Sequence, residues 1–425
     1  MSVFHRLRPA IIFLGLAALL LLPSVTWADG VVVFPDPKLE DRIRDTIDKP
    51  AGDIYQSDLE SLTILRADLI GVTDLTGLEY CTGLTELSLS YNEISDISPL
   101  ASLSSLHSLH LHVNQVGDIS PLASLTGLTS LSIAENLVSD ISPLSGLTGL
   151  TELHISENLV SDLTPLSGLT DLTMLTIQNN LISDLTPLSN LVNLTDLYFW
   201  RNQVSDLTPL SGLTGITDLR GGYNDISDLT PLSGFTGLTY LQMAGNKISD
   251  ISPLANCGES THLYLYRNDI SDVTPLSGLT ELYYLSLWDN EIGDISPLVA
   301  NDGLGEGDNL RIEKNPLSQE SVDVYVPQLE QRGVDVTWLP TKITPTEGPT
   351  TTLQPTTTLQ PTTTLQPTPT LLPTSTPSPV TATATPSPTP VSDEEAPFNL
   401  WIVIGPIIGV VLVGRLVLYL ARRGE

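Results

Sequence analysis

The chain has few basic residues, few cysteines and few aromatic side chains. Its 425 residues include 18 Lys and Arg against 49 Asp and Glu, a formal net charge of −31, and only two cysteines. Such an acidic chain repels nucleic acid and anionic lipid, so we expect the protein as a whole to bind neither. The sequence also lacks a Ser-His-Asp spacing, a glycine-rich phosphate loop and paired catalytic carboxylates. We therefore predict that it is not an enzyme, with no catalytic residues and no cofactor.

An apolar segment lies at the start of the chain. Residues 1–28 contain the basic Arg6 and Arg8, then an apolar run from Ala10 to Leu22, then the small-residue site Thr26-Trp27-Ala28. This order is typical of a secretory signal peptide that is removed by cleavage. An uncleaved anchor is the alternative, but about 13 apolar residues are short for a bilayer span of ~20.

A second apolar run lies near the other end, and at residues 399–421 it is long enough to cross a membrane. Acidic residues 393–395 precede it, and the tail 422–425 begins with two arginines. Because positive charge stays cytoplasmic, we predict one transmembrane helix, a cytoplasmic tail and an extracellular main body. Arg415 interrupts the run, close enough to its inner end to reach the interface.

The body of the chain is a repeat. Asparagine recurs every 22 residues from Asn92 to Asn290, within the pattern that begins Leu87-Ser-Leu89-Ser-Tyr-Asn92. The alternation of leucine and serine predicts a short strand with one buried face. The asparagine side chain has enough donors and acceptors to satisfy the bent backbone of its own and neighbouring turns. Ser98-Pro99 then opens a short helical turn that returns leucines to the core.

No single turn can bury its apolar side, but stacked turns share one core. We therefore predict a curved leucine-rich-repeat solenoid with one parallel strand and one short helical or 3-10 turn per repeat. Residues 62–317 should form it, in about 11 turns along an arc of roughly 50 Å. The first of these turns is degenerate, with Ile70 in the place of the asparagine.

Both ends of the solenoid carry a predicted cap. In residues 29–61, Asp36-Pro37 starts a helix whose buried stripe is Leu39, Ile43 and Ile47. In residues 318–338, we predict a helix over 318–332, a stop at Gly333 and a last strand over 334–338.

The repeat resembles that of bacterial internalin-type leucine-rich-repeat proteins. The flank is similar as well, since Phe34-Pro35-Asp36, Asp58-Leu59 and Gly77-Leu78-Glu79-Tyr80 match the family's N-terminal cap. The resemblance covers about residues 33–317 and implies the fold. It implies no particular ligand, because family members bind different partners.

Residues 339–396 have no apolar periodicity. Thr-Thr-Thr-Leu-Gln-Pro occurs three times between Thr350 and Pro367, and Thr, Ser and Pro continue after it. Such a segment cannot bury a core, so we predict a disordered, extended stalk that also permits O-glycosylation.

Three features resemble sites but have simpler explanations. Cys81 and Cys257 lie eight turns apart, ~38 Å along the stack and too far for a disulfide, so we predict small buried hydrophobes. Aspartates recur every 22 residues from Asp74 to Asp294. They could form a calcium ladder, but each has too few oxygens around it, so capping of the helical turn is favoured. The histidines offer no compact set of three ligands, and no metal is predicted; they are His107, His110, His112 and His154.

The residues that project from the strands change character along the chain. In the early turns they are small or acidic, whereas from the sixth Asn-bearing turn onward they are aromatic or basic. Strands favour aromatic residues in general, but this does not explain their concentration in the last turns. Trp, Tyr and Arg dominate interface energetics. We predict a ligand-binding concave face at Tyr198, Trp200, Arg201, Arg220, Tyr223, Tyr240, Tyr264, Tyr266, Arg267, Tyr284 and Trp288.

Gly221-Gly222 interrupts this region, with Gly221 in the place of a core leucine. It is read either as a point of close backbone approach or as a packing defect.

The predicted function is that of a membrane-anchored extracellular binding protein, an adhesin or receptor-like molecule, with a protein ligand favoured. A glycan ligand is the first alternative, because tyrosine and tryptophan also stack on sugars. A structural spacer of the cell envelope without a specific ligand is the second.

Overall fold

The computed structural model describes residues 29–338. The predicted signal peptide (1–28), stalk (339–396), transmembrane helix (399–421) and tail (422–425) lie outside the described residues. Within residues 29–338, no helix has the length and apolar character needed to cross a membrane.

One parallel sheet of 13 strands runs through the solenoid, with the strands in chain order. Each strand has three residues and pairs in register with the next, so that Leu87 lies beside Leu109. The middle residue of nearly every strand is a fully buried leucine, as the alternating pattern predicted. The strands are β3 (Ile64–Arg66), β4 (Glu86–Ser88), β5 (Ser108–His110), β6 (Ser130–Ser132), β7 (Glu152–His154), β8 (Met174–Thr176), β9 (Asp196–Tyr198), β10 (Asp218–Arg220), β11 (Tyr240–Gln242), β12 (His262–Tyr264), β13 (Tyr284–Ser286), β14 (Asn309–Arg311) and β15 (Asp335–Thr337).

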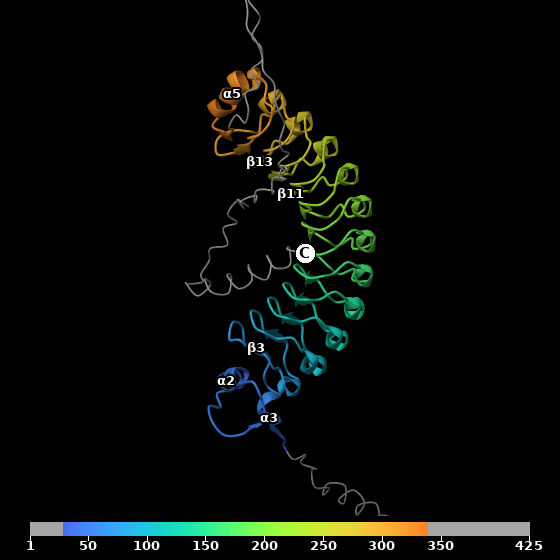
Figure 1. The fold of residues 1–425 in the computed structure, drawn as a ribbon, viewed down its shortest axis with the longest axis vertical. Coiled ribbons are helices and arrows are strands. Elements are labelled where there is room, and N and C mark those ends of the chain that lie inside the picture. Colours follow the sequence, from blue (N-terminus) through green and yellow to red (C-terminus); the bar gives the residue numbers. More distant parts are fainter. Residues whose placement is uncertain (1–28, 339–425) are drawn as a thin grey trace, which may run out of the picture. The chain divides into compact units, whose positions relative to one another are not determined.

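Short helical turns form the other side of each repeat. The strands lie on the inner side of the arc and these turns on its outer side (Figure 1). From η2 onward each turn has proline near its first residue, as Ser98-Pro99 predicted. The turns are η1 (Leu78–Tyr80), η2 (Ser98–Ser102), η3 (Ser120–Ser124), η4 (Ser142–Gly146), η5 (Thr164–Leu166), η6 (Thr186–Leu188), η7 (Thr208–Leu210), η8 (Thr230–Leu232), η9 (Ser252–Asn256), η10 (Thr274–Gly278) and α4 (Ser296–Val299).

The asparagine column joins neighbouring turns, as predicted. The Oδ1 of Asn180 accepts from the backbone N–H of Val160, one turn earlier, at 3.0 Å. Its Nδ2 donates to the carbonyls of Ile155 and Ile177 at 3.0 and 3.1 Å. The residue before each asparagine has a left-handed backbone, for example Asn179 with φ of 54°. The asparagine thus satisfies buried backbone groups next to this left-handed position.

The aspartate column caps the helical turns, which confirms the favoured prediction. The Oδ1 of Asp162 accepts from the backbone N–H of Thr164 at 2.8 Å, and the same bond recurs along the column. The two cysteines are free and fully buried. Burial raises the pKa of the Cys81 thiol to about 12 and that of Cys257 to about 11, so both remain neutral core side chains.

The N-terminal cap contains the predicted helix, α2 (Pro37–Thr46). The Asp36 carboxylate accepts from the backbone N–H of Lys38 at 2.9 Å and also from that of Thr73 at 2.8 Å, which ties the helix to the first turn. The cap also has a two-stranded antiparallel sheet of β1 (Val31–Val32) and β2 (Ile54–Tyr55), which flank α2 in the chain, followed by α3 (Gln56–Leu59). This small sheet was not predicted, because two-residue strands carry no periodic pattern.

The C-terminal end departs from the strict period. Twelve strands, β3 to β14, lie within residues 62–317, so the expected count of about 11 turns was too low. A three-residue insertion lies between Asn290 and Asn315, the next member of the asparagine column. The search for a strict 22-residue spacing therefore missed this turn.

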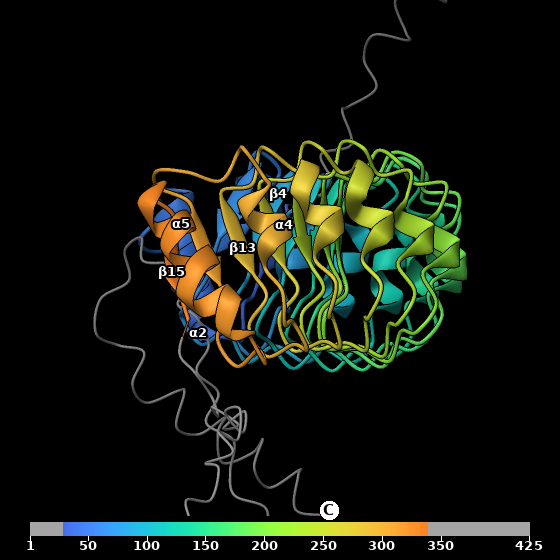
Figure 2. The same cartoon turned by 90° about the horizontal axis from the view of Figure 1, so that it is seen from above.

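The predicted last strand is β15, and the predicted helix comprises the π-helix η11 (Ser321–Tyr325) and α5 (Val326–Gln331). Gly333, with φ of 93°, ends the helix as predicted. Figure 2 looks onto this end, with α5 and β15 nearest the viewer.

Candidate ligand-binding face

The predicted binding residues project from the strand side of the solenoid. Tyr198, Arg220, Tyr240, Tyr264 and Tyr284 lie in strands β9 to β13. Trp200, Tyr266 and Trp288 follow their strands by two residues. Arg201, Tyr223 and Arg267 occupy the left-handed position before an asparagine. All are partly buried except Arg201, which is exposed.

One group forms a stack that we call the tyrosine ladder: Tyr240, His262, Tyr264 and Tyr284. The rings of Tyr240 and His262 are nearly parallel, with centroids 5.5 Å apart. The rings of His262 and Tyr284 are also nearly parallel, with centroids 6.3 Å apart. Tyr264 packs between them, 5.2 Å from Tyr240 and 4.9 Å from Tyr284. The rings stack because neighbouring strands are only ~4.8 Å apart.

Arg220 closes one end of the ladder. Its guanidinium lies 4.2 Å from the Tyr240 ring centroid and 4.3 Å from that of Tyr198. It donates two hydrogen bonds to Asp218, at 2.8 and 2.7 Å, and the Tyr198 hydroxyl donates to the same carboxylate at 3.0 Å. Burial opposes the charge of Arg220, but the bonds to Asp218 outweigh it and raise the arginine pKa. Burial and Asp218 likewise raise the pKa of Tyr198, which keeps the phenol neutral.

A second group follows the ends of the strands, and we call it the tryptophan edge: Trp200, Arg201, Tyr223, Tyr266, Arg267, Trp288 and Lys314. Tyr266 and Trp288 stack at 4.8 Å with ring planes 10° apart. Arg201 lies 5.3 Å from the Trp200 centroid and 5.7 Å from that of Tyr223. The hydroxyls of Tyr223 and Tyr266 are 3.5 Å apart, which connects the two parts of the edge.

Two members of these groups were not predicted. His262 stands in the same repeat position as Tyr240 and Tyr284, so the 22-residue spacing contained the signal. Burial lowers the pKa of His262 and favours its neutral ring in the stack. Lys314 precedes Asn315 as Arg267 precedes Asn268, but the three-residue insertion concealed this equivalence.

The glycine pair has a packing explanation. A Cβ on Gly221 would lie 2.3 Å from the Phe199 ring, because phenylalanine fills the space that a core leucine at 221 would occupy. The structure therefore has a compensated large and small pair rather than a defect. Gly222 approaches a neighbour closely, since its N–H donates to the Gln242 side chain at 2.9 Å. Gly245 leaves room for the Tyr223 ring.

The early half of the same face is different. His110 lies 3.0 Å from the Ser108 hydroxyl, and His154 lies 3.1 Å from that of Thr176. Burial lowers the pKa of His112 and of His154. Among residues 29–338, no group of three or more His, Cys, Asp or Glu side chains is placed to hold a metal ion.

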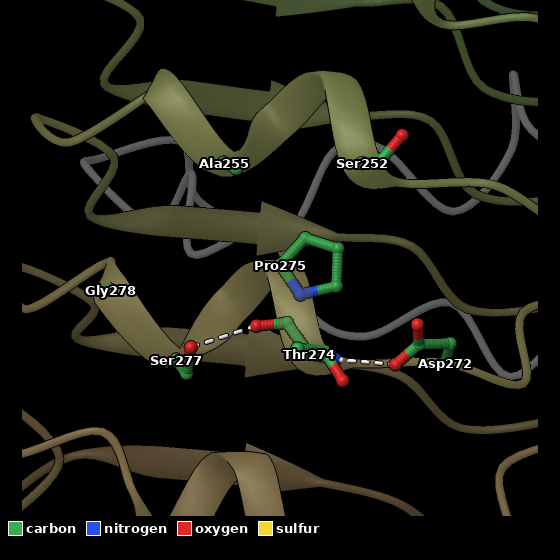
Figure 3. A pocket seen from close by; sticks show the side chains of 7 residues that line it. All are labelled: Ser252, Ala255, Asp272, Thr274, Pro275, Ser277 and Gly278. Carbon is green, nitrogen blue, oxygen red and sulfur yellow. Dashed lines mark hydrogen bonds between the residues drawn. The ribbon is translucent and has the colours of Figure 1, made fainter.

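The outer surface has a depression between η9 and η10 (Figure 3). The backbone N–H of Thr274 donates to Asp272 at 2.8 Å, and the Ser277 hydroxyl donates to the Thr274 carbonyl at 2.8 Å. These bonds belong to the repeat itself, so the depression reflects the stacking of turns. Its lining residues are Ser252, Ala255, Asp272, Thr274, Pro275, Ser277 and Gly278.

Comparison with known proteins agrees with this architecture. The family model for leucine-rich repeats in two copies matches residues 82–124, 126–168 and 170–212. The crystal structure of an internalin, InlF, from Listeria monocytogenes is 37% identical over 72% of this chain and 91% of that one, with a TM-score of 0.68. The chain belongs to the internalin family. The resemblance predicted from the sequence is thereby confirmed, and this internalin is a leucine-rich-repeat protein of a non-enzymatic family, as expected.

Two further structures are similar. Internalin C2 from Listeria monocytogenes is 33% identical over 51% of this chain and 98% of its own, with a TM-score of 0.50. A leucine-rich-repeat protein of Leptospira interrogans shares the fold at 18% identity over 66% of this chain and 85% of its own, with a TM-score of 0.55. No curated protein matches the chain. Membership of the internalin family assigns this internalin to the bacterial surface proteins.

Proposed function

We propose that this internalin is a surface binding protein, an adhesin or receptor-like molecule, whose protein ligand docks on the tyrosine ladder and the tryptophan edge. The observation that carries the proposal is the concentration of stacked aromatic rings and cations on turns β9 to β14. The solenoid core does not require them, because each turn already buries its own leucines. Partly buried, mutually packed aromatic side chains are rigid, so little entropy is lost when a partner covers them.

The ring geometry favours a protein over a glycan. Tyr266 and Trp288 cover each other's faces, and Tyr240 and Tyr284 stack on His262. A sugar would need an exposed ring face to stack on. Rings packed in this way offer their edges and hydroxyl groups instead, which suit backbone carbonyls and side chains of a protein.

The test is a pull-down with the purified full chain and a variant carrying Trp200→Ala, Tyr266→Ala and Trp288→Ala. Because buried aromatic anchors each contribute about 2 kcal/mol or more to binding, we expect affinity for a captured protein to fall at least about 100-fold. Thermal unfolding should change little, since these side chains lie outside the leucine core.

A matched control is Tyr91→Ala, which removes an exposed aromatic residue from the same face in an early turn. Capture should survive in this variant. If the triple variant also captures the ligand, the proposed site is wrong, and if only a glycan array gives binding, the protein ligand is wrong.

We further propose that residues 1–28 direct export, residues 339–396 act as a spacer and residues 399–421 anchor the chain in the membrane. The sequence patterns support this arrangement. A stop codon after residue 396 should release the protein into the medium, and retention on the cell would contradict the anchor.

A further inference from the structure

The tryptophan edge carries cations at three turns. Arg267 lies 4.9 Å and Lys314 5.0 Å from the centroid of the same ring, Trp288. Arg201 lies over Trp200 and Tyr223, farther along the edge. Each of these cations directly precedes a member of the asparagine column. Each therefore has the left-handed backbone of the residue before the asparagine, with φ of 55° to 57°. The repeat therefore holds all three in one column along the same margin of the face.

The cations around Trp288 are less neutralised than the arginine of the tyrosine ladder. Asp218 satisfies Arg220 with two short hydrogen bonds. Asp289 lies 3.7 Å from Arg267, and both side chains are substantially exposed. In the described part of the chain, no carboxylate lies within ion-pair distance of Lys314. Two cations thus share one indole ring with a single nearby acidic partner, which leaves a local excess of positive charge.

The exposed edges of the aromatic rings are positively polarised, as the neighbouring cations are positively charged. An aromatic ring is negative on its faces and positive at its edge. On the tryptophan edge the faces are covered by Tyr266 and by cations, so the ring perimeters remain for a ligand. Acceptor groups, above all carboxylates, match both the ring edges and the cations.

We propose that the partner presents an extended acidic peptide segment that crosses the turns along the tryptophan edge. The inference rests on the proposed function and specifies its ligand. Arg201 and Arg267 are three turns apart and Arg267 and Lys314 two, which at ~4.8 Å per turn gives about 14 and 10 Å. An extended chain rises ~3.3 Å per residue and presents every second side chain to the same face. Acidic side chains four residues apart therefore meet Arg201 and Arg267, and a third one, two or four residues farther on, lies within reach of the flexible Lys314 side chain.

The net charge of −31 restricts where on the solenoid an acidic segment can bind. Most of the solenoid repels an acidic segment, and screening at physiological salt limits that repulsion to a Debye length of about 8 Å. The tryptophan edge carries Arg201, Arg267 and Lys314 in one column, so it favours a single register of an acidic segment on this face.

The test is selection of a phage-displayed library of random 12-residue peptides on the purified full chain. We expect enrichment of Asp and Glu at two positions four residues apart, with a third acidic residue two or four residues farther on. In the best peptide, replacing the acidic residues by Gln or Asn should lower affinity about tenfold, measured by calorimetry. The variant Arg201→Gln/Arg267→Gln/Lys314→Gln should lose the acidic preference.

The matched control, Arg42→Gln/Arg66→Gln/Lys247→Gln, removes the same charge elsewhere and should select the same peptides as the parent chain. Selection of peptides without acidic enrichment, or of none at all, overturns the inference. If the Trp200→Ala/Tyr266→Ala/Trp288→Ala variant then still captures its protein ligand, the proposed function fails too. If it loses that ligand, only the acidic preference is wrong.

Discussion

At the scale of single residues, Phe199 and Gly221 show how the repeat tolerates exceptions. Both stand where the pattern has leucine-type core residues, in neighbouring turns, and the phenylalanine ring occupies the volume that glycine leaves. A leucine at 221 would overlap the Phe199 ring, because protein cores are packed to nearly crystalline density.

The pair predicts a strong coupling in a double-mutant cycle. Gly221→Leu should cost about 1–3 kcal/mol of unfolding free energy through overpacking against Phe199. Phe199→Leu should cost about 1 kcal/mol by leaving a void. The double variant restores the leucine pattern, so its loss should be smaller than the sum by about 1–2 kcal/mol. Urea unfolding of the four proteins measures this, and simple additivity would contradict the packing explanation.

Residue roles that follow from spacing were predictable, and contacts across turns were not. The asparagine and aspartate columns were assigned correctly, because their donors and acceptors match the bent backbone and the helical turn. The compensation of Gly221 by Phe199 depends on which ring faces which gap, and the sequence alone left two interpretations open. His262 was overlooked although it shares the position of Tyr240.

At the scale of elements, the aspartate column accepts hydrogen bonds at the start of the helical turns. Hydrogen bonds lower the pKa of Asp118 and Asp140, chiefly those from the backbone N–H of Ser120 and Ser142. For Asp162 the Thr164 hydroxyl has the largest effect. A carboxyl whose pKa is lower in the folded than in the unfolded state stabilises the fold above its unfolded pKa. That contribution is lost as pH falls through the folded value.

We therefore expect a pH-dependent effect of Asp118→Asn/Asp140→Asn/Asp162→Asn. The amide keeps an acceptor oxygen but has no charge, so the variant should have a lower urea midpoint than the parent at pH 7. The difference should shrink below about pH 4, where the carboxyls of the parent become protonated. An equal difference at pH 7 and pH 2.5 would show that charge is not involved.

The elements at the two ends were the least predictable. The β1–β2 sheet pairs segments with no repeat pattern, and β14 lies in a turn lengthened by three residues. The same insertion concealed Lys314, so a local error in register removed one member of the candidate site.

At the scale of the whole molecule, the solenoid is a one-dimensional stack in which each turn contacts mainly its neighbours. The stability of such a stack is close to a sum over turns and their interfaces. Function and stability can therefore be separated by removing complete turns.

Two deletions of 22 residues test this separation. Deleting 138–159 removes a turn of the early half and joins Leu137 to Val160. Deleting 226–247 removes the β11 turn with Tyr240 and joins Asp225 to Ile248. Both proteins should fold with similarly lowered thermal stability, as circular dichroism would record. Ligand capture should persist in the first and be lost in the second. Equal capture by both would place the ligand elsewhere.

The left-handed position before each asparagine has an evolutionary consequence. Tyr, Val, Glu, Asn, Arg, Gly, Asp and Lys all occur there, at Tyr91, Val113, Glu135, Asn179, Arg201, Gly245, Asp289 and Lys314. The hydrogen bonds of the following asparagine hold the backbone of this turn, so the position accepts side chains of very different kinds. Evolution can therefore change the chemistry of this margin of the solenoid one turn at a time while the frame of the repeat is kept.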